Sequence, residues 1–271
     1  MDAMLTFLGE WNPAVDTSIS WRAKYTLWGS IVSFVCSFVP GMLFVAVGDF
    51  GWGGGLLEPY AIRKGTKKRL PSKEQQWTAI RTGTKDLFLK PLLFYLAFPT
   101  LGEPLLKFGI ERLEPLQFLG DLFKMEVIFS LSFYLTHRTL HEVNWLYVNV
   151  HKIHHQFHET VGFAGQYAHI VEEATSAFHV TIAAFLVRPN FITWMAFFGV
   201  VVFEVVDAHS GYEVPWRWIY PWSNVYPWGS GARIHDYHHS HNKGSYGGGL
   251  IGFDRLFGTD KDYHNFYKKE T

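Results

Sequence analysis

Residues 174–203 read ATSAFHVTIAAFLVRPNFITWMAFFGVVVF, an apolar stretch in which Arg188 separates two uncharged runs. The runs, Ala174–Val187 and Pro189–Phe203, are together too long for a single transmembrane helix, which needs about 20 residues. Because Pro189 and Asn190 supply turn residues between them, we predict a helical hairpin. A hairpin returns to the side of the membrane that it entered, so the segments before and after it face one compartment.

The composition of the 271-residue chain also indicates contact with lipid. Apolar residues make up 48% of the chain and charged residues 18%, below the roughly 25% usual in soluble domains. Lys and Arg balance Asp and Glu at 24 each, which excludes the basic surface expected of a nucleic-acid-binding protein. The single cysteine, Cys36, excludes an internal disulfide framework and any multi-cysteine metal site.

Three further apolar segments precede the hairpin. Residues Tyr25–Gly48 carry no charge and are long enough to span a bilayer, with Pro40 as a local break. Residues Leu87–Leu101 are interrupted by prolines and fit either a short membrane span or a re-entrant segment. A further helix is predicted over Leu116–Thr136. We therefore predict an all-α integral membrane protein with about four transmembrane or re-entrant helices and a cytosolic histidine-rich cap.

The chain divides into a polar N-terminal segment (residues 1–24), membrane helices (25–136) and a catalytic region (137–271) that includes the hairpin at 174–206. The membrane helices are joined by a basic loop containing Arg63, Lys64, Lys67, Lys68, Arg69 and Lys73. The positive-inside rule assigns this loop to the cytosol. Lys268 and Lys269 resemble a dilysine retrieval signal, which would place the C-terminus in the cytosol and the protein in the endoplasmic reticulum.

Histidines form the most informative pattern, because all 14 lie between His137 and His264. Three clusters have the spacings H-x-x-x-H, H-x-x-H-H and again H-x-x-H-H: His137 and His141; His151, His154 and His155; His235, His238 and His239. Helical residues three or four apart share a face, so each cluster directs imidazoles at a common point. Neutral imidazole binds iron, zinc, copper or nickel. Eight ligands exceed one tetrahedral ion and are enough for two ions with open coordination positions.

These motifs resemble the fatty acid hydroxylase / sterol desaturase superfamily, and within it the C-4 methylsterol oxidases. The matching stretches are HRTLH from His137, HKIHHQF from His151, QYAH ending at His169, DAHSGYEVPW from Asp207, HDYHH from His235 and FDRLFGTD from Phe253. The middle motif departs from the Glu-Tyr-Ala-His-Pro of relatives, because this chain has Gln166 and Ile170.

The resemblance implies a membrane enzyme of the endoplasmic reticulum with two iron ions held by histidines. Such an enzyme would use O2 and two electrons to oxidise the C-4 methyl group of a sterol intermediate. His169 and His209 resemble additional ligand positions. The candidate metal ligands are therefore His137, His141, His151, His154, His155, His169, His209, His235, His238 and His239. Glu172, Asp207 and Asp236 are candidates to orient these imidazoles.

Four histidines outside the motifs are expected to have ordinary packing or surface roles: His158, His179, His241 and His264. No G-x-G-x-x-G sequence opens a helix after a strand, so electrons must come from a separate donor. The resemblance implies cytochrome b5 with its NAD(P)H-dependent reductase. The sterol substrate is expected to enter from the membrane past the aromatic segment Trp216–Trp228.

Several alternatives remain open from the sequence. A sterol desaturase, or a hydroxylase of sphingoid bases or fatty acids, would use the same ligands. A zinc-dependent membrane hydrolase would need no O2, because zinc has no redox chemistry. A histidine-rich metal carrier would bind metal without converting any lipid.

Overall fold

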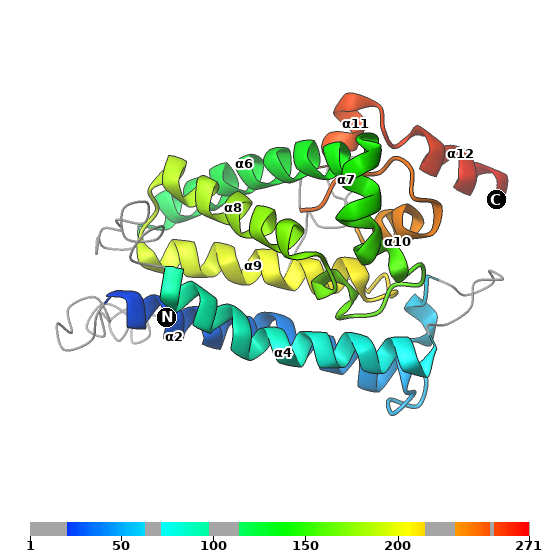
Figure 1. Ribbon diagram of the computed structural model, residues 1–271, viewed down its shortest axis with the longest axis horizontal. Helices are drawn as coiled ribbons and strands as arrows, with labels where there is room; N and C mark the ends of the chain where they lie inside the picture. The colour runs from blue at the N-terminus through cyan, green and yellow to red at the C-terminus, as the bar shows by residue number, and fades with distance from the viewer. Residues whose placement is uncertain (1–20, 63–71, 98–113, 215–230, 250–251, 271) are drawn as a thin grey trace.

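The computed structural model describes residues 21–62, 72–97, 114–214, 231–249 and 252–270. These residues form helices, and the only strand-like pairing among them is an isolated bridge between Ala61 and Tyr212. Figure 1 shows long helices lying side by side, with shorter helices gathered near the C-terminus at one end. The predicted all-α architecture is confirmed.

Three helices of the described chain are long and apolar enough to cross a membrane: Tyr25–Asp49, Ile170–Val187 and Phe191–His209. The basic residues 63–69, the aromatic segment 215–228 and most of the N-terminal segment lie outside the described residues. The cytosolic placement and the route of substrate entry that were predicted from these segments therefore stay predictions.

The first membrane-capable helix is continuous but changes its helical type along its length. Its consecutive parts are α2 (Trp21–Ser33), the π-helix η1 (Phe34–Phe38), α3 (Val39–Leu43) and the π-helix η2 (Phe44–Asp49). Pro40, at the start of α3, has no N–H to donate, and a change to π geometry is one way in which membrane helices satisfy the freed carbonyls. The break predicted at Pro40 is therefore absorbed within a single helix.

The predicted hairpin is formed by α8 (Ile170–Val187) and α9 (Phe191–His209). Arg188 ends α8 in the left-handed conformation, with φ of 57°. Asn190 then caps α9, because its side chain accepts a hydrogen bond from the Thr193 N–H at 2.8 Å. The turn thus lies where the sequence predicted it, and the start of α8 and the end of α9 lie at the same end of the hairpin.

Two other long helices complete the bundle. Helix α4 (Lys73–Ala97) continues through Pro91, so this proline does not interrupt the helix as expected, and Pro99 lies outside the described residues. Helix α6 (Pro115–Glu142) extends two turns beyond the predicted Leu116–Thr136. This extension keeps His137 and His141 on one helix.

Helix α9 lies at the centre of the bundle. It contacts α2, α6 and α10. In its most apolar 18-residue stretch 56% of the residues are buried, compared with 22% in each of the other two membrane-capable helices. Met125, Phe129, Trp194 and Phe197 belong to the core between these helices. Large apolar side chains of the first helix, such as Leu27 and Leu43, instead lie exposed, which is typical of a surface in contact with lipid.

Short helices cover the end of the bundle where α6 and α9 finish (Figure 1). They are η3 (Glu58–Tyr60), α7 (Asn144–Asn149), the 3₁₀ helices η5 (His151–Gln156) and η6 (Ala164–Gln166), α10 (Ala232–His241), α11 (Phe253–Phe257) and α12 (Lys261–Glu270). The second H-x-x-H-H motif thus forms a 3₁₀ helix, whereas the third lies on an α-helix.

Candidate metal centre

Nine histidines converge in two adjacent groups at this end of the bundle. The five-histidine group consists of His137, His141, His151, His155 and His238. The four-histidine group consists of His154, His209, His235 and His239. Within each group one nitrogen of every ring lies within 4.8 Å of the others, and each group could hold a metal ion. All nine side chains are buried except that of His141, which is partly exposed.

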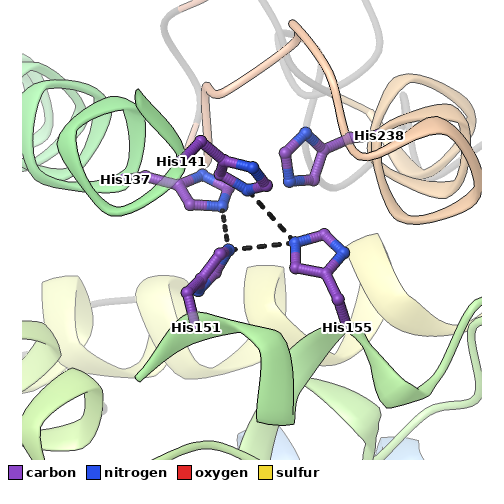
Figure 2. Close-up of side chains that lie close together, drawn as sticks. All are labelled: His137, His141, His151, His155 and His238. Carbon is purple, nitrogen blue, oxygen red and sulfur yellow. Dashed lines mark hydrogen bonds between the residues drawn. The ribbon is translucent and has the colours of Figure 1, made fainter. Parts of the chain in front are cut away.

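The five-histidine group draws on three elements (Figure 2). His137 and His141 lie one turn apart near the end of α6, and His151 and His155 lie four residues apart on η5. His238 enters from α10. The Nε2 atom of His151 lies 3.1 Å from that of His137 and 2.9 Å from that of His155. The imidazoles therefore meet with their Nε2 atoms inward.

The four-histidine group is built by the end of α9, by η5 and by α10. His209 Nε2 lies 2.8 Å from His235 Nε2 and 3.3 Å from His154 Nε2. His235 and His239, four residues apart on α10, have their Nε2 atoms 3.1 Å apart. The neighbouring His238 points about 100° away from His239 around the helix, toward the other group. Each H-x-x-H-H motif is therefore shared between the two groups.

Hydrogen bonds on the outer nitrogen orient most of these rings. Six histidines donate through Nδ1 to a fixed acceptor: His137 to the Tyr246 carbonyl, His151 to Glu172 Oε1, His154 to the Tyr167 carbonyl, His209 to the Val205 carbonyl, His238 to the Gly244 carbonyl and His239 to the Phe157 carbonyl. A neutral imidazole carries one N–H, so each of these rings presents a lone pair at Nε2. Acceptors of this kind are typical of metal-ligating histidines.

The inward lone pairs fit a pair of metal ions. His137 and His151 both present acceptor nitrogens across 3.1 Å, so neither can donate to the other. The Nε2 atom of His238 is buried and has no hydrogen-bond partner among the described residues. Two nitrogens bound at about 2.1 Å to one ion lie roughly 3.0 Å apart at a right angle. The observed spacings of 2.8–3.3 Å match that geometry.

Burial keeps these imidazoles neutral. Desolvation lowers the pKa of His154 to about 4, although its bond to the Tyr167 carbonyl opposes the shift. Desolvation, reinforced by neighbouring imidazoles, lowers the pKa of His235, His238 and His239 well below the ordinary value of 6.5. At neutral pH the rings are therefore in the state that binds a metal.

The loop after α10 contributes a support that the sequence did not reveal. Asp254 accepts hydrogen bonds from the backbone N–H groups of Tyr246 at 2.7 Å and Gly247 at 2.6 Å, and from Thr259 Oγ1 at 2.6 Å. It thereby holds the loop whose Tyr246 and Gly244 carbonyls orient one histidine each. Gly244 has φ of 68°, and a Cβ there would lie 2.5 Å from the Thr259 carbonyl oxygen. Asp254 lies in the FDRLFGTD stretch that resembles the superfamily, but the sequence alone predicted no role for this residue.

The structure brings together the eight motif histidines and His209, but it does not bring His169 to either group. His169 caps α8, and its Nδ1 accepts a hydrogen bond from the Val171 N–H at 3.2 Å. Glu172 contacts a ligand candidate, as predicted. The carboxylate of Asp236 accepts a hydrogen bond from Thr160 Oγ1, and the orienting roles of Asp207 and Asp236 stay predictions.

The fold and the two groups together define a helical membrane protein with a histidine-rich site suited to two metal ions. The chain belongs to the fatty acid hydroxylase family, whose model matches residues 122–259. The superfamily resemblance inferred from the histidine motifs is thereby confirmed.

Two kinds of enzyme are represented among the relatives of this chain. The very-long-chain aldehyde decarbonylase GL1-8 of Oryza sativa subsp. indica is 40% identical over 85% of this chain and 81% of its own length. Methylsterol monooxygenase 2-2 of Arabidopsis thaliana is 38% identical over 51% of each chain. Methylsterol monooxygenase 1 of Gallus gallus is 26% identical over 97% of this chain and 86% of its own. No solved structure matches the chain.

Proposed function

We propose that the protein is a membrane-bound di-iron oxygenase that oxidises the C-4 methyl group of sterol intermediates. The observation that carries this proposal is the convergence of nine histidine Nε2 atoms in two adjacent groups at the end of membrane-capable helices. The methylsterol monooxygenases among the relatives support the substrate class. Two iron ions bound there would supply the reduction of O2 and the oxidation of an unactivated C–H bond.

The residues of this chain perform three tasks in that reaction. The two groups bind the ions through neutral imidazoles, and the carbonyls and Glu172 behind them fix the direction of each ring. Burial of the rings excludes bulk water from the reacting atoms. Because zinc has no redox chemistry, an all-imidazole site that oxidises a methyl group requires a redox metal such as iron.

The surroundings of the site support delivery of a lipid. The end of α9 carries His209, and Glu172 in the first turn of α8 contacts His151, so a substrate dissolved in the bilayer would reach the site along these helices. Electrons would come from cytochrome b5 and its NAD(P)H-dependent reductase, in the endoplasmic reticulum membrane with the histidines on the cytosolic side.

A second candidate function is conversion of a very-long-chain aldehyde. It is favoured by the rice decarbonylase that is 40% identical over most of the chain, a higher identity than that of either methylsterol monooxygenase. Its substrate would be converted at the same two histidine groups, which lie at the end of membrane-capable helices.

A product scan separates these functions. Microsomes containing the wild type or the His238→Ala variant would receive NADH, O2 and a panel of 4-methylsterols, long-chain aldehydes, sphingoid bases and fatty acids. We expect an O2-dependent hydroxymethyl or carboxyl product at C-4 of the sterol, absent in the variant, by mass spectrometry. Conversion of a long-chain aldehyde to an alkane one carbon shorter would instead establish the second candidate. Loss of two hydrogens, or oxygen gained by another lipid, would identify a desaturase or a different hydroxylase.

A further inference from the structure

A small pocket lies between α6 and α8, beside the five-histidine group. Four lining residues come from α6, among them the ligand candidate His137. The other four come from the N-terminal half of α8 and are polar: Glu172, Thr175, Ser176 and His179. The centres of water-sized groups can occupy about 10 Å³ of the pocket, which is room for a single oxygen atom and too little for a ring or chain. The pocket therefore suits a small polar group.

His179 lines this pocket and is itself buried. Its side chain is 2% exposed, and its Nδ1 has no hydrogen-bond partner in the part of the chain that the structure describes. The ring lies edge-on to Phe129 and Phe133, with centroids 6.5 and 6.0 Å apart. A leucine would pack against these rings without burying an unsatisfied nitrogen. The packing role expected from the sequence does not account for a histidine here.

Glu172 supplies the complementary acceptor. Its Oε1 accepts the hydrogen bond from His151, whereas its Oε2 is buried and has no partner among the described residues. The hydroxyls of Thr175 and Ser176 donate to the Glu172 carbonyl, so their oxygens remain able to accept. A hydroxyl group fits this lining, because it can accept from an imidazole N–H and donate to a carboxylate at once.

We propose that this pocket binds the hydroxyl group of the lipid substrate, and that His179 determines the preference for a hydroxylated lipid. The inference rests on the proposed function, because it takes the substrate of the metal centre to be a lipid. A 4-methylsterol carries its hydroxyl on C-3, the carbon next to C-4. Since His137 lines the pocket, an anchored hydroxyl holds the neighbouring methyl group near the five-histidine group.

The test measures binding separately from turnover. The metal-loaded protein in lipid nanodiscs, kept without O2 and electron donor, would be titrated with 4α-methylcholestan-3β-ol and with its 3-methyl ether, which cannot donate. We expect the wild type to bind the free alcohol about 10-fold more tightly than the ether. His179→Leu should abolish this preference, and His179→Gln, whose amide both donates and accepts, should restore much of it.

Turnover and metal content complete the experiment. With O2 and electrons supplied, His179→Leu should raise KM for the alcohol about 10-fold while kcat and bound metal stay near wild type. Leu186→Ala, a change at an exposed position two turns further along α8, is the control and should change neither value.

Three outcomes decide the matter. An unchanged preference for the alcohol in His179→Leu would overturn the inference, even if the sterol is oxidised. A fall in kcat with an altered pH profile and an unchanged KM would also overturn it, because His179 would then carry protons. If the wild type binds the alcohol preferentially and His179→Leu does not, but neither oxidises it, the pocket stands and the proposed substrate fails.

Discussion

At the level of single residues, the chemistry of the site depends on which nitrogen of each histidine carries the proton. The carbonyls of Tyr246 and Gly244 accept from Nδ1 of His137 and His238, so both rings direct a lone pair at the same point. Lone pairs held this close repel one another until a cation lies between them. Removal of a single ligand should therefore weaken binding of one ion far more than it disturbs the fold.

His238→Ala tests this expectation, with His241→Ala as the control on the same helix. His241 stacks on Tyr237 and lies outside both groups. We expect His238→Ala to lower metal affinity by more than about 100-fold, because removal of a ligand exceeds the effect of losing its hydrogen-bond partner. Iron per chain, measured by inductively coupled plasma mass spectrometry, should fall only in the ligand variant. Full metal content with full activity would exclude His238 as a ligand.

Glu172 tests the role of a carboxylate behind a ligand. Its Oε1 lies 2.9 Å from His151 Nδ1, which increases the basicity of that ring. Glu172→Gln keeps an acceptor oxygen but removes the charge, so we expect metal affinity to fall about 10-fold. Competition with a chelator of known affinity measures this change. An unchanged affinity would mean that the carboxylate charge does not act through His151.

At the level of elements, the loop between α10 and α11 contacts two helices that carry ligand candidates, α6 and α10. Asp254 accepts hydrogen bonds from two backbone N–H groups and from the Thr259 hydroxyl. The loop that these bonds fix directs one carbonyl to a histidine of α6 and another to a histidine of α10. The loop therefore ties the last turn of α6 to α10, and both carry ligand candidates.

Asp254→Ala should release that loop. Buried donors would be left without an acceptor, so we expect the free energy of unfolding to fall by about 1–3 kcal/mol and metal affinity to fall with it. Glu58→Ala, at an exposed carboxylate on η3, is the control and should change neither. Thermal unfolding in detergent, with and without bound metal, measures both effects. A destabilised variant with unchanged metal affinity would separate the loop from the site.

At the level of the whole molecule, the buried histidines make the free energy of unfolding depend on pH. The folded pKa of His154 is about 4, below the ordinary 6.5 of an unfolded histidine. A lowered pKa means that the unfolded chain binds more protons between these values, so the stabilisation is present above pH 6.5 and is lost as the pH falls. The other lowered histidines act in the same direction.

We therefore expect metal-free protein to lose stability on mild acidification. His154 alone contributes a loss of about 2 kcal/mol between pH 7 and pH 5, at 1.36 kcal/mol per pH unit below 6.5. Denaturant titrations of chelator-treated protein across this range measure the loss, and bound iron should reduce it until protons displace the metal. A flat profile from pH 7 to pH 5 would mean that the histidines are not neutral and buried without metal.

The sequence alone was sufficient to predict the class of protein, because the patterns that define this class lie within short segments of the chain. A turn at Arg188 between two apolar runs predicts a hairpin from residues that are neighbours in the sequence. Histidines at i, i+3 and i+4 likewise lie on one face of a helix. The family and the eight motif histidines of the two groups followed from the same short patterns, whereas His209 was expected from the family resemblance.

The tertiary structure was needed wherever the answer depends on contacts between distant segments. The division of each H-x-x-H-H motif between two groups depends on how η5 and α10 face each other, which their spacing does not encode. His169 fits the motif pattern, yet the start of α8 uses its ring as a cap. Asp254 and His179 gain their roles from a loop and a pocket formed by residues far apart in the chain, since burial and hydrogen-bond partners are set by packing.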